Sequence, residues 1–155
     1  IGGVAAVLPY ATERGVRLGI EPLHPMFAAD RSVIVTLGQA NAIAARLASP
    51  NVGVIVDVYH VWWDPQVEAA IREAGRRILG FHVDDWIVPL PDVLAGRGMM
   101  GDGVIELRRL RRAVDAVGYE GPIEAEIFNE VLWAQDMNDV VRTVAQRYRE
   151  TVAGD

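Results

Sequence analysis

The sequence predicts an α/β fold in which parallel strands alternate with helices. Four short apolar segments, rich in the residues of buried strands, alternate along the chain with longer segments of helical periodicity. Each apolar segment ends on a carboxylate or an imidazole. Strands that alternate with helices pair in parallel, which places all of these ends on one side of a sheet. The predicted strands are residues 16–20, 52–56, 77–82 and 122–127.

The first two predicted helices have clear end signals. Residues 3–14 have helical composition and stop before Gly15, a common helix terminator. A long proline-containing loop follows the first strand. Thr36 then begins the second helix, because Gln39 stands three residues later at the capping-box position, and the helix runs to about Leu47.

The later helices follow the same logic. Asp64 caps the third helix, which begins at Pro65 and ends at Gly75. A glycine-rich loop precedes the fourth helix, residues 105–117, whose leucines and valines recur at helical spacing. The last helix covers residues 138–151. The chain therefore reads as a helix followed by four strand–helix units.

Composition excludes several classes of protein. The chain has 155 residues, of which 51% are apolar and 23% charged, as in one globular domain with a hydrophobic core. The net charge of -6 provides no basic surface for nucleic acid or anionic lipid. No apolar stretch is long enough to cross a bilayer, and the absence of cysteine is compatible with a cytoplasmic protein. We expect neither a nucleic-acid partner nor membrane association.

The number of strands is too small for a closed barrel. Four strand–helix units are half of a TIM barrel, whose usual size is roughly 250 residues. The chain also begins at Ile1 inside a predicted helix, without an initiator methionine. We therefore expect residues 1–155 to be a partial TIM barrel domain whose N-terminal half is missing. Such a half exposes strand edges and an apolar face, which favours association.

The strand-end side chains are candidate metal ligands. Glu21, Asp57, His82 and Glu126 each end or follow a predicted strand, so a parallel sheet brings them to one edge. Each alone has an ordinary explanation, as a helix cap, a surface carboxylate or a hydrogen-bonded interior histidine. A charge at the end of every buried strand is unfavourable unless it is paired or metal-bound, and this favours one shared site.

The donor set indicates the ion and its chemistry. Three carboxylates and one imidazole suit Mn²⁺, with Mg²⁺ or Co²⁺ as alternatives, better than a closed structural zinc site, which favours thiolates and imidazoles. Such an ion stabilises the negative charge that forms when a carbon beside a carbonyl loses a proton, and flanking carboxylates can move that proton. His24 and His60 also follow strand ends and are candidate substrate contacts.

Five motifs in order resemble one family. The phrases LGIEPLHP, VIVDVYH, GFHVDDW, GRGMMGDGVIE and GYEGPIEAEIF are similar to the C-terminal half of the sugar phosphate isomerase/epimerase family, within the xylose isomerase-like TIM barrels. The resemblance implies a (β/α)₈ barrel of which these are strands five to eight. It also implies a divalent metal held by Glu21, Asp57, His82 and Glu126, with Glu21 and Glu126 as the proton-transfer pair on opposite faces of the reacting carbon.

The resemblance extends less completely to substrate-binding residues. His60 matches a position that contacts a substrate oxygen, and Arg97 resembles an arginine that grips a hydroxyl. Phe27 stands where some ketose epimerases have a substrate-contacting glutamate, and Val88 replaces an arginine six residues beyond His82. These departures disfavour simple ketose 3-epimerisation and leave isomerisation, or dehydration of a cyclic polyol ketone, open.

Neighbouring side chains have both a functional and a structural interpretation. Trp62 and Trp86 can wall a sugar pocket, because flat aromatic faces pack against C–H surfaces, or they can simply pack their loops. The glycines of residues 98–103 can cradle a phosphate, but a tight turn is favoured because no lysine accompanies them. Glu124 shares a strand face with Glu126, and we expect it inside the barrel and not among the ligands.

The predicted function is that of a metal-dependent sugar, sugar phosphate or polyol isomerase or epimerase. It would act by carboxylate-mediated proton transfer next to a metal-bound carbonyl or hydroxyl. The alternatives are an inosose-type dehydratase using the same site and a catalytically inactive barrel fragment. The expected partner is a small-molecule sugar or polyol, and we expect the full-length protein to be a cytoplasmic homo-oligomer. A nucleic-acid repair enzyme on the same barrel would need more histidines and a basic groove.

Overall fold

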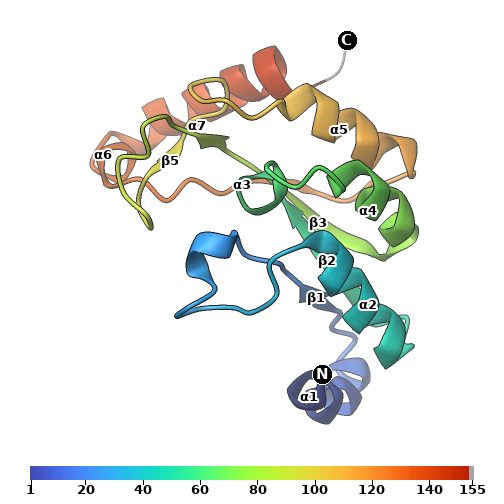
Figure 1. Ribbon diagram of the computed structural model, residues 1–155. Helices are drawn as coiled ribbons and strands as arrows, with labels where there is room; N and C mark the ends of the chain where they lie inside the picture. The colour runs from blue at the N-terminus through green and yellow to red at the C-terminus, as the bar shows by residue number, and fades with distance from the viewer. Residues whose placement is uncertain (154–155) are drawn as a thin grey trace.

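A parallel sheet forms the centre of the fold. The computed structural model describes residues 1–153, and within them four strands lie side by side in the order β1-β2-β3-β6 (Figure 1). All neighbouring strands in this sheet are parallel, as the alternating sequence pattern predicts. The strands are β1 (Leu18–Ile20), β2 (Val52–Asp57), β3 (Ile78–Val83) and β6 (Ile123–Ala125).

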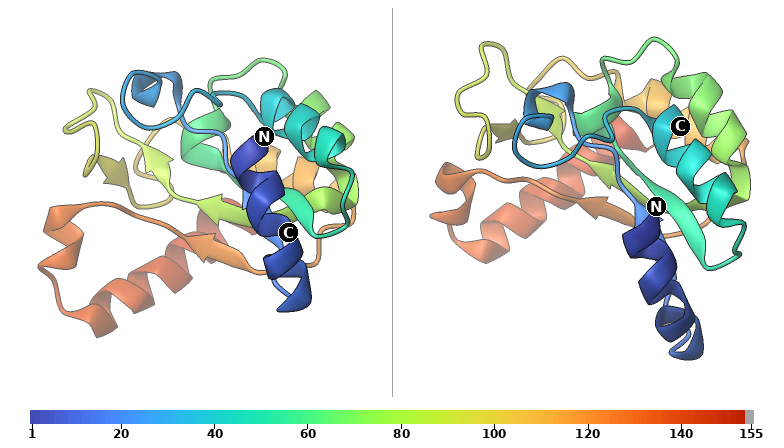
Figure 2. Two further views of the ribbon diagram at one scale, coloured as in Figure 1. Left: turned by 90° about the horizontal axis from the view of Figure 1, so that it is seen from below. Right: turned by 60° about the horizontal axis from the view of Figure 1, so that its bottom comes forward.

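Helices cover one face of this sheet. The principal helices are α1 (Gly2–Glu13), α2 (Leu37–Leu47), α4 (Val67–Ala74), α5 (Leu107–Ala116) and α7 (Met137–Arg147). Helices α2 and α4 pack against β2, and α5 packs against α4 (Figure 1). Helix α1 contacts β1 but extends away from the rest of the molecule (Figure 2). Within residues 1–153, no helix has the length and apolar character needed to span a bilayer.

Short elements complete the chain. They are the 3₁₀ turns η1 (Pro25–Phe27) and η2 (Gly75–Arg77), the helices α3 (Val58–Val61) and α6 (Glu130–Trp133), and the π-helical turn η3 (Tyr148–Val152) that continues α7. The sequence pattern did not reveal α3 and α6, because four residues are too few to show helical periodicity.

The predicted start of α2 is confirmed, whereas that of α4 is wrong. In α2, Thr36 Oγ1 accepts the backbone N–H of Gln39, and Gln39 Oε1 accepts the backbone N–H of Thr36, each at 3.2 Å. Before α4, Asp64 Oδ1 accepts the backbone N–H of Gln66 at 2.8 Å, which folds this segment into a turn. The helix therefore begins at Val67, two residues later than the sequence indicates.

A small antiparallel pair follows β3 where the sequence predicts only a loop. Strand β4 (Asp85–Trp86) pairs with β5 (Arg97–Gly98). The buried carboxylate of Asp85 accepts the backbone N–H of Gly101 at 2.9 Å and that of Ile105 at 3.0 Å. The glycine-rich segment is thus tied to the end of β3 through Asp85, and this anchor holds β5 beside the strand ends.

The two faces of the sheet differ in packing. On the face covered by helices, β2 contributes three buried valines, Val52, Val54 and Val56. On the opposite face, Ile55 lies across glycines of both neighbouring strands. A Cβ atom added to Gly19 would lie 2.7 Å from the Ile55 side chain, and one added to Gly80 would lie 2.9 Å from it. One isoleucine therefore covers positions on three strands, and this face carries few large side chains.

Candidate metal centre

The predicted ligands converge at the C-terminal ends of the strands. Asp57 is the last residue of β2 and pairs in register with His82 of β3. Glu21 directly follows β1, and Glu126 directly follows β6. One potential ligand atom from each of these residues lies within 4.8 Å of the others. The parallel sheet thus brings the four residues together, and their role as ligands stays a prediction.

His82 lies between the two glutamates. Its Nδ1 atom is 3.1 Å from Glu126 Oε2 and 3.4 Å from Glu21 Oε1. The hydrogen bond with Glu126 and the nearby carboxylate of Glu21 raise the pKa of His82 to about 10, and the contact with His82 lowers the pKa of Glu126 to about 2. The imidazolium is the counter-charge for both glutamates, and a cation bound here would have to displace its proton.

Asp57 is the most buried member of this cluster. Its side chain is 0% exposed, and Oδ1 accepts the backbone N–H of Tyr59 at 2.9 Å. Burial raises the pKa of Asp57 to about 7, in spite of the opposing effect of Arg97. A carboxylate held this far from water is stabilised by any additional positive charge placed beside it.

Arg97 supplies positive charge to three carboxylates. Its Nη1 atom is 2.7 Å from Asp84 Oδ2, 2.9 Å from Asp57 Oδ2 and 3.3 Å from Glu126 Oε2. Nη1 also donates to the backbone carbonyl oxygen of Glu126 at 3.1 Å. The sequence indicates a residue that grips a substrate hydroxyl. In the structure Arg97 is buried, and its nearest contacts are the carboxylates of the cluster.

Asp84 is a site residue that sequence reasoning missed. Its side chain is fully buried, one oxygen contacts Arg97, and the other, Oδ1, has no hydrogen-bond partner among the described residues. Burial, followed by the proximity of Asp57, raises the pKa of Asp84. The available signal was the pair of aspartates that directly follows the apolar strand β3, since two adjacent carboxylates at a buried strand end need counter-charges.

Glu124 does not have the environment that its strand position predicts. Its side chain is 67% exposed, and Oε2 is 3.9 Å from His82 Nε2. The expected strand face is therefore correct, whereas the expected burial is wrong. The reason is that this face of the sheet is open in the part of the chain that the structure describes.

His60 is buried beside Arg97. Its Nδ1 atom accepts the backbone N–H of His24 at 3.0 Å. Nε2 lies 3.2 Å from Arg97 Nη2 and 3.7 Å from Asp57 Oδ2. Burial, aided by the Arg97 guanidinium, lowers the pKa of His60 to about 3. The ring is therefore uncharged at neutral pH.

A cavity of about 190 Å³ opens onto this cluster. Two of the predicted substrate contacts, His60 and Arg97, lie on its wall together with the predicted ligands Glu21 and Glu126. The remaining lining residues are Leu23, Phe27, Arg31, Leu94 and Phe128. The space is thus bounded by charged side chains on one side and by apolar side chains on the other.

The other predicted substrate contacts are not on this wall. His24, Trp62 and Trp86 pack together instead. The ring centre of Trp86 is 4.7 Å from that of His24 and 5.6 Å from that of Trp62. This arrangement corresponds to the loop-packing interpretation of the tryptophans.

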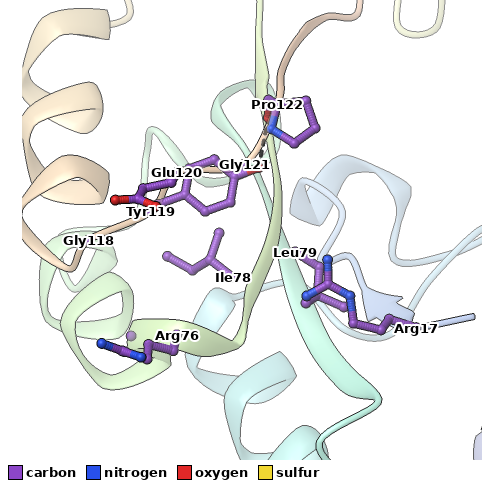
Figure 3. A pocket seen from close by; sticks show the side chains of 10 residues that line it. Arg17, Arg76, Ile78, Leu79, Gly118, Tyr119, Glu120, Gly121 and Pro122 are labelled. Carbon is purple, nitrogen blue, oxygen red and sulfur yellow. Dashed lines mark hydrogen bonds between the residues drawn. The ribbon is translucent and has the colours of Figure 1, made fainter. Parts of the chain in front are cut away.

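A second cavity, of about 300 Å³, lies at the opposite end of the strands (Figure 3). Arg17, Arg76 and Tyr119 contribute side chains, and the turn that precedes β6 forms much of its wall. Tyr119 donates its hydroxyl hydrogen to the backbone carbonyl of Pro122 at 2.7 Å. Among the described residues, no cluster of three or more potential metal ligands lies at this end.

The residues at the C-terminal ends fit a divalent cation. Glu21 Oε1 is buried and has no hydrogen-bond partner among the described residues, although it points into the cluster. Three carboxylates and one imidazole are a suitable donor set for Mn²⁺, Mg²⁺ or Co²⁺. Because the chain has no cysteine, the set does not correspond to a thiolate-based structural zinc site.

Comparisons with known proteins agree with this architecture. A family model described as xylose isomerase-like TIM barrel matches residues 1–151. The crystal structure of protein SMc04130 from Sinorhizobium meliloti 1021 is similar over 99% of the chain, with 51% identity and a TM-score of 0.95. A ketose 3-epimerase from Arthrobacter globiformis is 24% identical over 87% of the chain, and a 3-dehydroshikimate dehydratase from Pseudomonas putida is 29% identical over 78% of it.

These relatives are longer than the chain. The matched region covers 56% of the Sinorhizobium protein, 43% of the Arthrobacter epimerase and 19% of the Pseudomonas dehydratase. The chain therefore spans about half the length of the first two relatives and a smaller part of the third.

Proposed function

The chain belongs to the xylose isomerase-like TIM barrel family, and we propose that it is part of a divalent-metal-dependent isomerase or epimerase acting on a sugar, a sugar phosphate or a polyol. In this proposal residues 1–155 supply the C-terminal half, strands five to eight, of a (β/α)₈ barrel. The parallel order of the strands supports a barrel, and the match to 56% of a longer relative supports a partial one.

In the proposed site, Glu21, Asp57, His82 and Glu126 hold the cation, with Mn²⁺ preferred over Mg²⁺ and Co²⁺. The ion, when bound, supplies a Lewis acid that stabilises negative charge on substrate oxygens. Asp57 and His82 come from the two central strands and are the more buried members, with side chains 0% and 17% exposed. These two side chains are therefore suited to holding the metal ion in one position.

The observation that carries the proposal is the origin of the two glutamates. Glu21 follows β1 and Glu126 follows β6, which are the two edge strands of the sheet. Their side chains, 33% and 29% exposed, both line the cavity, and each places one carboxylate oxygen within 3.4 Å of His82 Nδ1. For epimerisation, one carboxylate removes the proton from the carbon beside a carbonyl, and the other, in its protonated form, returns a proton to the opposite face.

The remaining cavity residues position the substrate in this proposal. His60 is placed to hydrogen-bond a substrate oxygen, which is consistent with its neutral ring and its place on the cavity wall. Arg97 keeps Asp57 and Glu126 in place and reaches the same cavity. The aromatic cluster of His24, Trp62 and Trp86 shapes the loops behind these residues.

The test compares Glu126→Gln with Glu124→Gln, a matched change on the same strand whose side chain is 67% exposed. We expect Glu126→Gln to abolish the interconversion of ketose epimers and to weaken Mn²⁺ binding more than about a hundredfold. Loss of a residue that only hydrogen-bonds to a metal ligand already weakens metal binding about 10–100-fold. Calorimetry measures Mn²⁺ binding, and proton exchange with D₂O measures turnover. Unchanged Mn²⁺ affinity in Glu126→Gln would contradict the ligand assignment.

A dehydratase is the second candidate function, and the similarity to the 3-dehydroshikimate dehydratase favours it. Both reactions begin when a carboxylate removes a proton beside a carbonyl. They differ in the next step, because a dehydratase expels a hydroxyl group from the neighbouring carbon as water and leaves a carbon–carbon double bond. Ultraviolet absorbance of the conjugated product distinguishes dehydration from epimerisation, which leaves the substrate mass and absorbance unchanged.

An inactive fragment, a cytoplasmic location and a homo-oligomeric full-length protein stay predictions. Gel filtration and Mn²⁺ titration of the chain address the first and the last. A stable monomer that binds Mn²⁺ and turns over a ketose would exclude the inactive fragment. A species that binds Mn²⁺ without turnover would support it.

A further inference from the structure

The cavity beside the metal cluster has a cation at its rim that the proposed chemistry does not use. We propose that Arg31 selects substrates that carry an anionic group, a carboxylate or a phosphate, at the end remote from the reacting carbon. This inference rests on the proposed function, because it assumes that the reacting carbon lies beside Glu21 and Glu126. It names a substrate class that the proposal above leaves open.

The arrangement of polar and apolar side chains around the cavity is the first argument. Glu21, His60, Arg97 and Glu126 form its polar side. The other lining residues, apart from Arg31, are all apolar: Leu23, Phe27, Leu94 and Phe128. A sugar with a hydroxyl on every carbon would leave several of its hydroxyls without partners against such a wall. A ligand with a polar reacting end, an apolar middle and a charged end fits it better.

The second argument is that Arg31 and Arg97 differ in how fully their charges are matched. Arg97 is buried and contacts three carboxylates. Among the described residues, the one carboxylate within 4.0 Å of Arg31 is Asp30, at 3.7 Å from Nε, and both side chains are largely exposed. An exposed pair of this kind is weak and leaves the two terminal nitrogens of the guanidinium for another anion. Of the two arginines on the cavity wall, Arg31 is thus the one whose terminal N–H groups are left for a ligand.

The third argument is that local structure holds Arg31 at the rim. Its backbone N–H donates to the carbonyl of Phe27 at 3.0 Å, and its guanidinium carbon lies 5.5 Å from the centre of the Phe27 ring. Phe27 itself is buried, and its 3₁₀ turn is capped by His24, whose Nδ1 accepts the backbone N–H of Met26 at 3.2 Å. The guanidinium is therefore carried by an anchored turn that also places Phe27 on the cavity wall.

Charge balance is the fourth argument. Glu21, Asp57, Asp84 and Glu126 are four carboxylates around one point, and a divalent ion together with Arg97 leaves one negative charge in formal terms. That excess repels an anionic substrate. Arg31 places a positive charge on the cavity wall, and this reduces the repulsion of an anion there.

The experiment uses three probes that share a three-carbon polyol frame: glycerol, glycerate and glycerol 3-phosphate. Their binding to the Mn²⁺-loaded protein is measured by calorimetry for the wild type, Arg31→Gln, Arg31→Lys and Arg46→Gln. Arg46 is an exposed arginine in the last turn of α2 and does not line the cavity. Mn²⁺ affinity of each variant is measured first. Circular dichroism checks that every variant is folded.

We expect the wild type to prefer one anionic probe over glycerol by about tenfold or more, as one charge-assisted hydrogen-bonded contact provides. Arg31→Gln should lose this preference, while Arg31→Lys and Arg46→Gln retain most of it. A preference for glycerate identifies a carboxylate, and a preference for glycerol 3-phosphate identifies a phosphate ester. A preference that survives Arg31→Gln means that the anion binds the metal, and it overturns the inference, as does the absence of any preference.

Failure of this inference is distinguishable from failure of the proposed function. If the wild type does not bind Mn²⁺, the metal site itself is wrong. If all variants bind Mn²⁺ equally well and the probes do not respond to Arg31, the metal site stands and the anionic substrate class is refuted.

Discussion

A cavity lies at each end of the sheet, and the larger of the two has no cluster of potential metal ligands among the described residues. The cavity at the strand starts has about 300 Å³ and is bounded by Arg17, Arg76 and turn backbone (Figure 3). The cavity at the strand ends has about 190 Å³ but adjoins the imidazoles of His60 and His82, the buried guanidinium of Arg97 and a cluster of four carboxylates. Volume therefore does not identify the site here. The site is identified instead by charged groups that are buried together and stabilise one another.

The difference has a physical origin in the direction of the strands. At the strand starts, the chain arrives through tight turns such as Gly75 and Gly118, which have φ of +52° and +74° and carry no side chain. At the C-terminal ends, each strand has a polar side chain at the point where the chain leaves the core. The following predictions test whether the two ends differ as this comparison requires, beginning with the largest expected effect.

Replacing Arg97 by Met should destabilise the metal-free protein strongly at pH 8. The change leaves Asp57, Asp84 and Glu126 without their shared cation, and breaking a buried ion pair by removing one partner typically costs about 3–5 kcal/mol. Urea unfolding measures the loss. Arg76→Met, at the other end of the sheet, is the matched control. A loss for Arg97→Met no larger than for this control would remove the distinction between the two ends.

His60 should make the stability depend on pH in a defined direction. Its pKa is about 3 in the folded protein and about 6.5 when unfolded, so the unfolded chain binds a proton first as the pH falls. The folded state therefore loses stability from His60 below about pH 6.5, by about 2 kcal/mol at pH 5.

The comparison of wild type with His60→Gln isolates this effect from other titrating groups. Between pH 7 and pH 5, the free energy of unfolding of His60→Gln should rise by about 2 kcal/mol relative to that of the wild type. His82 does not interfere, because its pKa of about 10 makes its stabilising contribution complete below pH 6.5, and that contribution is lost only as the pH rises through about 10. Parallel pH profiles for the two proteins would show that His60 is not buried as described.

The smallest effect is expected at the strand starts. The double variant Arg17→Gln and Arg76→Gln changes two exposed side chains, and exposed substitutions usually alter stability by less than about 0.5 kcal/mol. Its Mn²⁺ affinity should stay within about twofold of the wild type, because these charges lie at the other end of the sheet and are screened by solvent. A larger change in Mn²⁺ affinity would mean that the two ends are electrostatically coupled.

The part of the site that could be predicted from the sequence follows from one rule. Because parallel strands share a direction, Glu21, Asp57, His82 and Glu126 could be placed together without knowing any distance. The capping box of α2 was predictable for a similar reason, since Thr36 and its partner are close in sequence. Local signals and shared strand direction thus account for the elements and the cluster.

The rest depends on contacts that no local pattern encodes. Asp84 joins the site only because Arg97, 13 residues away, is brought to it by a pair of two-residue strands. Trp62, which follows α3, and Trp86, which lies in β4, pack against each other. Aromatic residues that line a sugar site and aromatic residues that pack against each other therefore look alike in sequence. Glu124 has the predicted face but not the predicted burial, because burial depends on what covers that face.

The anchor made by Asp85 has a consequence for the order in which the site assembles. It ties Gly101 and Ile105, which are only 16 and 20 residues away, so this loop closes with little loss of chain entropy once β3 exists. The contact between Arg97 and Glu126 spans 29 residues and needs β6 to dock first. Arg97 is then in place before Glu126 reaches the site. The carboxylates are therefore not brought together without their positively charged partner. Pulsed hydrogen exchange during refolding should find the Gly101 and Ile105 amides protected before those of β6.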